Sequence, residues 1–302
     1  MNQTDLHIHS VYSNDGTYSP DELLHMASSA GILVMAVADH NTVRGSARAL
    51  HLAWKYQVEV IPAVELDCTF QGLNLHVLGY GIDTTFSGFS ALETSLAAQE
   101  RASSIPRMEL LHQMGLEFDE QKAVSLAHYG YITGEIIAEV ALQDPRNNSL
   151  PLLEAYRPGG KRSDNPYVNF YWDFCAPEKP AYVPIDFISL ADAVQLICSS
   201  GGIPILAHPG NNVPRCREDL LLQILQQGVC GMEVYTTYHN TEQQQYYRKI
   251  AEKLGCLKTI GSDFHGKTKP SIHLGQMDIP EDESTILAQL RHTLHKQDTS
   301  VV

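Results

Sequence analysis

Hydrophobic residues in the first part of the chain fall into short continuous runs. Predicted helices separate the first three of these runs from one another. The runs are rich in aliphatic and β-branched residues and predict strands at residues 4–9, 32–38, 58–64, 67–70 and 75–80. The run 32–38 is apolar throughout, as expected of a strand buried on both faces of a parallel sheet. Ser19 and Glu22 form a capping box that begins a helix, and Gly31 ends it. A second helix is predicted over residues 42–56, so the order of elements predicts an α/β fold.

The alternation of strands and helices stops in the middle of the chain. Helices are predicted there at residues 87–114, 119–128 and 133–142, and a loop-rich stretch follows at 144–179. The alternation then returns, with strands predicted at 203–207, 231–235 and 257–260 and helices at 189–200, 217–227, 241–254 and 283–295. We therefore expect a barrel domain formed by residues 1–83 and 181–302, which a helical insertion (cap) domain of residues 84–180 interrupts.

Composition and charge restrict the class of protein further. The 302 residues are 43% hydrophobic and 19% charged, which is ordinary for a globular chain, and no apolar run approaches the length of a membrane span. The formal charge of −14 disfavours a grip on duplex or long single-stranded nucleic acid. It still permits a small phosphorylated molecule, because bound divalent cations are outside that count. The six cysteines include no CxxC pair and no signal peptide precedes Asp5, so we expect a reduced, cytoplasmic protein without a membrane partner.

Metal-ligating side chains gather at the carboxyl ends of the predicted strands or just beyond them, except for His76, which lies in a predicted hairpin beside one of these strands. His7 and His9 lie two residues apart on one strand, so both point to the same face. The full set is His7, His9, Asp15, His40, Glu65, His76, His208, Asp263 and His265. Since the carboxyl ends of barrel strands share one edge, these donors should meet there. Nitrogen and oxygen donors without cysteine suit two or three divalent ions such as Zn²⁺, Mn²⁺ or Fe²⁺.

The local motifs around these residues add a resemblance to a known family. They read Asp-x-His-x-His from Asp5, Ser-Asn-Asp-Gly from Ser13, Ala-Asp-His-Asn from Ala38, Ala-His-Pro from Ala207 and Gly-Ser-Asp-Phe-His from Gly261. With the strand-end Glu65, this set resembles the PHP (polymerase and histidinol phosphatase) family of metal-dependent phosphoesterases. The interrupted layout is similar to the branch that acts on nucleoside 3′,5′-bisphosphates and on the 5′ ends of short oligoribonucleotides. The resemblance implies a distorted (β/α)7 barrel with a clustered metal centre and a helical insertion.

The resemblance also implies a role for each of the nine residues. A first ion would be held by His7, His9, Glu65 and Asp263, a second by Glu65, His76 and His208, and a third by Asp15, His40 and His265. Glu65 would bridge the first two ions, and a metal-activated water would attack the phosphorus atom. Catalysis is then expected to depend on His7, His9, Glu65, Asp263 and His265. The acid for the leaving group would be a metal-bound water, His265 or His239.

Residues outside the nine have two interpretations each. Arg44 and Lys267 closely follow predicted ligands of the third ion, and each is either a phosphate clamp or an ordinary surface charge. His239 either contacts the substrate or only begins a helix. The branch carries a Thr/Ser-Arg-Pro-His segment in its insertion, whereas residues 131–136 here read Tyr-Ile-Thr-Gly-Glu-Ile, without the Arg and the His. This departure leaves the exact substrate open but not the metal chemistry.

The expected reaction is hydrolysis of a phosphate ester on a nucleotide with two separated phosphates, or on a very short 5′-phosphorylated oligonucleotide. Arg157, Lys161 and Arg162 in the insertion could form one basic patch for a second phosphate. The nearest alternative is a histidinol-phosphate-type phosphatase of small metabolites. A C–N hydrolase of the amidohydrolase type also begins with His-x-His, but it usually bridges its metals with a carbamylated lysine where this chain has Glu65. A non-enzymatic nucleotide sensor is disfavoured, because structural metal sites are closed and need four ligands.

Overall fold

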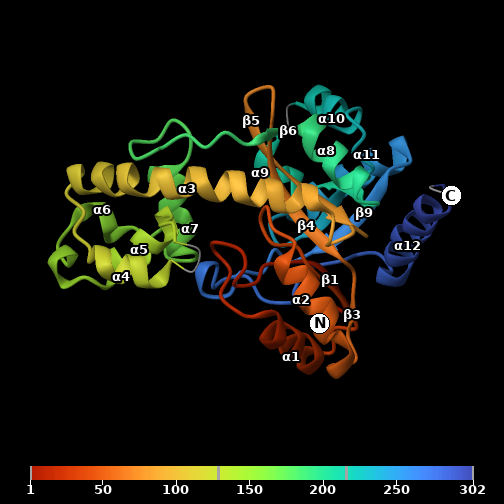
Figure 1. The fold of residues 1–302 in the computed structure, drawn as a ribbon, viewed down its shortest axis with the longest axis horizontal. Coiled ribbons are helices and arrows are strands. Elements are labelled where there is room, and N and C mark those ends of the chain that lie inside the picture. The colour runs from red at the N-terminus through yellow and green to blue at the C-terminus, as the bar shows by residue number, and fades with distance from the viewer. Residues whose placement is uncertain (1, 128–129, 215–216, 301–302) are drawn as a thin grey trace.

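The strands of the computed structural model, which describes residues 2–127, 130–214 and 217–300, form two hydrogen-bonded sheets. One sheet contains the parallel strands β1 (Thr4–Ile8), β2 (Val34–Val37) and β3 (Glu59–Val60). The other has the order β6-β4-β5-β7-β8-β9. In that order its strands are Ile188–Ser189, Ala63–Phe70, Leu73–Tyr80, Ile203–Leu206, Gly231–Thr236 and Leu257–Gly261. Figure 1 shows these strands in one part of the molecule, beside a separate group of helices.

The two sheets join at both edges into one closed ring. Ile8 at the end of β1 bridges Phe264 after β9, and His40 after β2 bridges Glu65 in β4, both in parallel. β3 and β4 are two residues apart and follow one another along β2, so they share one position. The ring is therefore β1, β2, β3 with β4, β5, β7, β8 and β9, which makes seven positions. β5 runs antiparallel to both of its neighbours, and the predicted distorted (β/α)7 barrel is confirmed.

Helices cover the outside of this ring and one of its ends. They are α1 (Pro20–Ala30), α2 (Arg44–Leu52), α8 (Leu190–Ser199), α9 (Pro209–Asn212), α10 (Glu218–Leu225), α11 (Thr241–Leu254) and α12 (Glu283–Ser300), with 3-10 turns η1 (Ala53–Lys55) and η4 (Gly266–Thr268). α1 begins with the predicted capping box of Ser19 and Glu22, and Gly31 ends it in the left-handed conformation. Leu287 and Leu290 of α12 pack into the same buried cluster as residues at the starts of β2 and β7. α12 therefore covers the end of the barrel at which the strands begin.

The described residues between β5 and β6 form helices and loops only. The elements are α3 (Ser87–Gln113), α4 (Glu120–Leu126), α5 (Gly134–Gln143), η2 (Pro145–Asn147), α6 (Pro151–Glu154), α7 (Pro166–Phe170) and the π-helical turn η3 (Tyr171–Cys175). We call residues 87–175 the helical segment. Leu111, Ile137 and Phe170 are fully buried in a hydrophobic cluster made within this part of the chain. Figure 1 shows α3 running from the barrel along the shorter helices.

The strand that carries Glu65 differs from the prediction. β4 is one long strand, because β5 pairs with it over its whole length, from Ala63 opposite Tyr80 to Phe70 opposite Leu73. Glu65 therefore lies inside a strand and not at its end.

The stretch predicted as loops contains the short helices α6 and α7.

The predicted helix at residues 119–128 is shorter in the structure. α4 ends at Leu126, and His128 lies outside the described residues. No helix in the described parts of the chain combines the length and the apolarity that crossing a membrane requires.

Contacts from the helical segment reach the loop after β1 and the connection between β9 and α12. They are the Tyr131 hydroxyl with the Asn14 side chain, Lys267 Nζ with Glu139 at 2.9 Å, and Ser271 Oγ with Asn165 Oδ1 at 2.8 Å. Each contact joins a loop at the carboxyl end of the strands to the helical segment, so this segment lies next to that end of the barrel.

Candidate metal centre

Four buried side chains converge at the carboxyl end of β1. His7 lies in β1 and His9 just after it, Glu65 comes from β4, and Asp263 follows β9. His7 Nε2 lies 3.1 Å from Glu65 Oε2 and 3.4 Å from Asp263 Oδ1. His9 Nε2 lies 3.2 Å and 3.0 Å from the same two oxygens. Two ligands of a tetrahedral ion that binds them at roughly 2.0–2.1 Å stand about 3.3 Å apart, so these donors have the spacing of one such site.

The second oxygen of Glu65 faces a different pair of histidines. Glu65 Oε1 lies 3.1 Å from His76 Nδ1 and 3.1 Å from His208 Nε2. His76 comes from β5 and His208 follows β7, so the next two strands of the ring after β4 contribute. One carboxylate thus lies between two groups of imidazoles, with one oxygen toward each.

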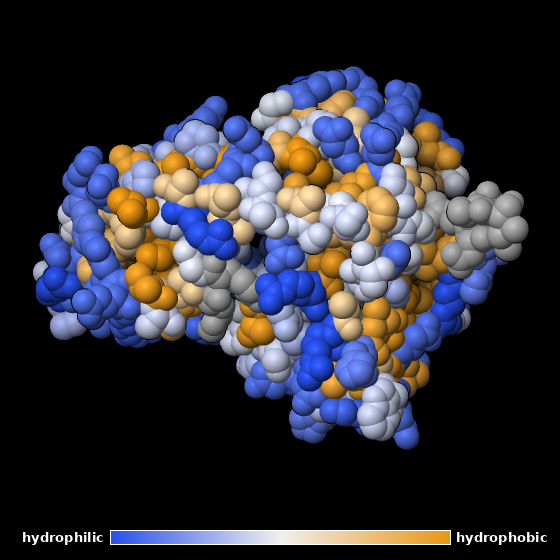
Figure 2. Space-filling view, viewed as in Figure 1, coloured by the Kyte–Doolittle hydropathy of each residue, from blue (hydrophilic) through white to orange (hydrophobic). Residues whose placement is uncertain are grey.

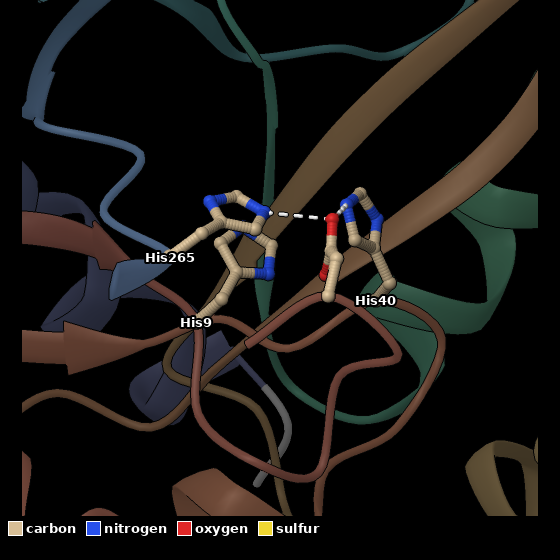
Figure 3. A group of neighbouring side chains, drawn as sticks. His9, His40 and His265 are labelled. Carbon is tan, nitrogen blue, oxygen red and sulfur yellow. Dashed lines mark ion pairs between the residues drawn. The ribbon is translucent and has the colours of Figure 1, made fainter. Parts of the chain in front are cut away.

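A third group surrounds Asp15, in the loop after β1. Figure 3 shows His9, His40 and His265 around this carboxylate. His265 Nε2 lies 3.0 Å and His40 Nε2 lies 3.9 Å from Asp15 Oδ2. The rings of His9 and His265 stack with their centroids 3.9 Å apart. The structure therefore brings all nine sequence-predicted residues into one cluster.

The donor atoms of the cluster fit bound cations. Within the described parts of the chain, several of its buried atoms have no hydrogen-bond partner: Asp15 Oδ1, His40 Nδ1, Glu65 Oε2, Asp263 Oδ1 and His265 Nε2. A buried polar atom without a partner costs roughly 1–3 kcal/mol, so leaving this many together is unfavourable without a ligand. Within each group the donor atoms all lie within 4.8 Å of one another, as the ligands of one ion do. Nitrogen and carboxylate oxygen donors of this kind suit Zn²⁺, Mn²⁺ or Fe²⁺.

Neighbouring groups fix the orientation of the histidine rings. His7 Nδ1 lies 3.0 Å from Glu233 Oε1, and the other oxygen of Glu233 accepts a hydrogen bond from the backbone N of His208 at 2.9 Å. His9 Nδ1 lies 3.1 Å from Ser13 Oγ. A carboxylate at Nδ1 of His7 assigns the proton to that atom, which leaves Nε2 with a lone pair toward the cluster.

Electrostatics favour the cation-binding protonation states of Glu65 and His265. Burial would raise the pKa of Glu65, but His7 and His40 outweigh it and hold that pKa well below its usual range. Burial lowers the pKa of His265 to about 4. Near pH 7 the carboxylate is therefore ionised and the His265 ring is neutral, and these are the forms that bind metal ions. In spite of burial, carboxylate neighbours raise the pKa of His7, His40 and His76, so a bound ion would compete with protons at those three rings.

Two further residues of the cluster are not predicted by the motifs. Asp67 Oδ1 lies 3.0 Å from His76 Nε2 and 3.4 Å from His40 Nδ1, so these three residues could hold an ion. A signal existed in the sequence, because Asp67 lies two positions after Glu65 and shares its face of the strand. Lys269 Nζ lies 2.7 Å from Asp263 Oδ2. Nothing in the sequence indicated that Lys269 lies at the cluster, because a loop has no periodic pattern that predicts where a side chain points.

The structure places the three predicted substrate-binding residues in different surroundings. Arg44 lines a cavity next to His40, and its Nη1 lies 3.4 Å from Glu93 Oε1. His239 is 5% exposed and its ring contacts the backbone, with Nδ1 2.9 Å from Val234 O and Nε2 2.9 Å from Gly210 N. Lys267 is paired with Glu139 of α5. Of the three, Arg44 has the position that best suits a substrate contact.

The basic residues of the helical segment do not all face the metal centre. Arg157 donates to the backbone oxygen of Asn147 at 2.9 Å, and Arg162 Nε lies 2.9 Å from Asp173 Oδ2. Arg162 also lines a cavity that contains His208. The predicted patch therefore does not act as one group of three free charges. Arg157 and Arg162 make contacts within the helical segment, and of these two only Arg162 also lines a cavity with a metal donor.

Three cavities meet at His40, between the barrel and the helical segment. The central one is lined by Asp15 and His76 of the barrel, by Tyr171 and Trp172 of the helical segment, and by Phe187, which directly precedes β6. The second extends past Tyr12, Arg44, Arg101 and Tyr131, and the third past His208, Tyr238, Asn212 and Arg162. Figure 2 shows the two parts of the molecule as lobes with an indented outline between them. The cluster thus opens into space that both parts line.

Comparisons with known proteins agree with this geometry. A 5′-3′ exoribonuclease of Haemophilus influenzae is 28% identical over 86% of this chain and 89% of its own length. A phosphoribosyl 1,2-cyclic phosphate 1,2-diphosphodiesterase of Eggerthella lenta is 27% identical, over 90% of this chain and 97% of its own. A 3′,5′-nucleoside bisphosphate phosphatase of Chromobacterium violaceum is 26% identical, over 93% of both chains.

Solved structures share the fold. The structure of an amidohydrolase from Chromobacterium violaceum, with bound SO4 and no metal, matches with a TM-score of 0.77 and 23% identity, over 95% of this chain and 96% of that one. A chain assigned as a metal-dependent phosphoesterase from Bifidobacterium adolescentis matches with a TM-score of 0.72 and 22% identity, over 95% and 94%. The family model of the PHP domain matches residues 5–156, slightly more than half of the 302 residues. This chain therefore belongs to the PHP domain family.

Proposed function

We propose that this protein is a metal-dependent phosphoesterase that acts on a small nucleotide with two phosphates or on a short 5′-phosphorylated oligonucleotide. The observation that carries the proposal is the Glu65 carboxylate, because each of its oxygens faces its own group of histidines at 3.1–3.2 Å. A carboxylate shared in this way suits two adjacent ions, the arrangement that serves displacement at phosphorus. A carbamylated lysine bridge of the amidohydrolase type is not needed, since Glu65 occupies the bridging position.

The ligand set follows from the three groups of donors. His7, His9, Glu65 and Asp263 would hold a first ion, Glu65, His76 and His208 a second, and Asp15, His40 and His265 a third. Asp67 would add an oxygen between the second and third groups, because it lies near both His40 and His76. When bound, such ions neutralise phosphoryl oxygens and lower the pKa of a coordinated water toward neutrality.

The protein's own residues would orient and shield the reacting group. Glu233 and Ser13 hold the rings of His7 and His9 in fixed orientations, so the donors need no rearrangement when the substrate arrives. The helical segment acts as a cap, because its residues line the cavities over the cluster and narrow the approach from solvent. We assign this capping role to residues 84–180.

The aromatic side of the central cavity favours a nucleotide as the substrate. Tyr171, Trp172 and Phe187 line this cavity together with several of the metal donors, and base stacking on aromatic rings is the usual sequence-tolerant way to hold a nucleobase. Arg44 and Arg101 line the neighbouring cavity, which could take a second phosphate. Two of the relatives, an exoribonuclease and a nucleoside bisphosphate phosphatase, are named for the same substrate class, whereas the third is named for a phosphoribosyl cyclic phosphate.

A substrate panel tests the proposal. The protein is loaded in parallel with Mn²⁺, Zn²⁺ or Fe²⁺ and assayed with a nucleoside 3′,5′-bisphosphate, a 5′-phosphorylated trinucleotide, a long single strand, a ribose cyclic phosphodiester, histidinol phosphate and an amide. We expect the highest kcat/KM for the first two. Hydrolysis of the amide alone, or of no phosphoester with any metal, would overturn the proposal. Faster turnover of the long strand or of histidinol phosphate would overturn the substrate class only.

Two variants accompany the panel. Glu65→Gln should abolish hydrolysis, because an amide cannot bridge two cations as a carboxylate does. Glu154→Gln on the exposed face of α6 removes one carboxylate far from the cavities and is expected to leave kcat/KM unchanged.

A further inference from the structure

Lys269 places its ammonium group against the metal cluster from a loop that follows β9. Its Nζ lies 2.7 Å from Asp263 Oδ2 and 2.8 Å from the Tyr238 hydroxyl. The Tyr238 hydroxyl also donates to Asp263 Oδ2, at 2.5 Å. Lysine, tyrosine and one carboxylate oxygen thus form a closed triangle. The other oxygen, Asp263 Oδ1, faces His7 and His9 and has no hydrogen-bond partner among the described residues.

The triangle leaves one N–H of the ammonium group without a protein acceptor. An ammonium group has three donors, and Asp263 and Tyr238 accept two of them. No third acceptor of Lys269 lies among the described residues. The side chain is only 12% exposed, yet it lines both the central cavity with Asp15 and His40 and the cavity that contains His208. The ammonium group of Lys269, with its one unused N–H, therefore lies where these two cavities adjoin.

The other positively charged side chains near the cluster are more exposed, or their terminal nitrogens already donate within the protein. Arg107 also lines the central cavity, but its Nη1 donates to Ile132 O at 2.6 Å and its Nη2 to Ser103 Oγ at 3.0 Å, which leaves only Nε without a partner among the described residues. The Arg44 and Lys267 side chains are 52% and 50% exposed and are paired with glutamates. Lys269 combines a cavity position, burial and an unused donor, and these three properties suit direct contact with a bound anion.

We propose that Lys269 is a catalytic residue that donates a hydrogen bond to a non-bridging phosphoryl oxygen of the substrate held at the metal centre. The proposal rests on the phosphoesterase function proposed above and adds one protein cation to the groups that bind the transferred phosphoryl group. Because Asp263 and Tyr238 fix the ammonium group before the substrate binds, its charge is available to the transition state without reorganisation. No bond to Lys269 forms or breaks.

A purely structural role for Lys269 makes a different prediction. Lys269 would then only balance the charge of Asp263, and its loss would act through the metal ions. The Tyr238 hydroxyl donates to the same oxygen of Asp263, so Tyr238→Phe removes a comparable support of this ligand while leaving the lysine in place. The two variants therefore separate support of the ligand from contact with the phosphate.

The experiment compares Lys269→Met, Lys269→Arg and Tyr238→Phe with the wild-type protein, each loaded with Mn²⁺. Lys253→Met, on the exposed side of α11, is the control for loss of a lysine charge. Thermal unfolding and bound Mn²⁺ are measured first, then the binding of inorganic phosphate by calorimetry, then kcat and KM for a nucleoside 3′,5′-bisphosphate. We expect Lys269→Met to keep its Mn²⁺, to bind phosphate at least about tenfold more weakly and to lose about 10²- to 10³-fold in kcat, as for removal of one oxyanion donor.

The conservative variants complete the test. Lys269→Arg should recover part of the phosphate affinity, and Tyr238→Phe should keep most of it. Unchanged phosphate binding in Lys269→Met, or a loss of activity in proportion to lost Mn²⁺, would overturn the proposal, and so would absence of phosphate binding to the wild-type protein. If Lys269→Met does not fold, Lys269→Gln provides the same comparison. If the wild-type protein hydrolyses no phosphoester, the proposed function fails, while phosphate binding still tests Lys269 independently.

Discussion

Replacing Glu233 with glutamine is expected to weaken metal binding without touching any metal donor directly. Glu233 accepts from His7 Nδ1 with one oxygen at 3.0 Å and from the backbone N of His208 with the other at 2.9 Å. A glutamine has only one oxygen for these two donors. If the oxygen faces His7, the amide N–H₂ opposes the backbone N–H of His208. If the amide is flipped, its N–H₂ faces His7 and drives the ring proton onto Nε2, where the cation should bind.

The size of the effect follows from the one unsatisfied group that either orientation leaves. A buried donor without an acceptor costs roughly 1–3 kcal/mol. At 1.4 kcal/mol per tenfold, this corresponds to a loss in Mn²⁺ affinity of about 5- to 150-fold. Mutation of such outer partners of histidine ligands typically costs about 10- to 100-fold, which lies inside this range.

Competition of the protein with a metal-binding dye measures the loss. The Mn²⁺ affinity of Glu233→Gln should fall by the stated factor, and excess Mn²⁺ should restore most of the activity. Glu252→Gln, on the exposed surface of α11, is the matched control and should match the wild-type protein. Wild-type Mn²⁺ affinity in Glu233→Gln would refute the argument that Glu233 fixes the His7 ring.

Three other predictions concern the same cluster. Glu65→Gln should lower the number of bound ions, measured by elemental analysis, more than Asp15→Asn, because Glu65 faces two groups of donors and Asp15 one; equal losses would contradict the bridging role. Gly261→Ala should destabilise the protein by about 1–3 kcal/mol in urea unfolding, since an added Cβ would lie 2.3 Å from both Glu233 Oε1 and His7 Cβ; an unchanged free energy of unfolding would count against it. Chelation should lower the melting temperature, because buried carboxylates lose their counter-ions, and Mn²⁺ at 100 times its Kd should return about 2.7 kcal/mol of stability; identical melting curves with and without metal would exclude the proposed site.

The sequence predicted the members of the cluster better than the elements that carry them. The strand-end histidines could be collected from the chain because carboxyl ends of parallel barrel strands share one edge, whatever the exact bounds of each strand. Glu65 lies inside β4, because pairing with β5 extends the strand beyond it. That pairing depends on a partner, so local pattern does not reveal it. Asp67 was missed for the same reason, because the strand was assumed to end at Glu65 and the two-residue spacing that places both carboxylates on one face was therefore not used.

Side chains in loops were the part that the sequence could not place. Lys269 lies in a loop, where no period of hydrophobic residues says which way a side chain points. His239 follows a strand on the expected side of the barrel, but its ring approaches the backbone at Gly210, where a Cβ would lie 2.6 Å from His239 Nε2. The approach depends on a glycine twenty-nine residues away, so only the folded chain reveals it. The helices at residues 87–114 and 133–142 were predictable, whereas their contacts with the barrel loops were not.

The contacts between the helical segment and the barrel would couple the binding of a nucleotide to the binding of the third ion. Asn14, which contacts Tyr131, precedes Asp15 directly, and Lys267, which pairs with Glu139, follows His265 by two residues. Two donors of the third group are therefore attached to loops that the helical segment touches, and a displacement of that segment moves them. If a bound nucleotide fixes the segment in its present position, the third ion binds more tightly. By thermodynamic reciprocity, that ion then raises the affinity for the nucleotide by the same factor.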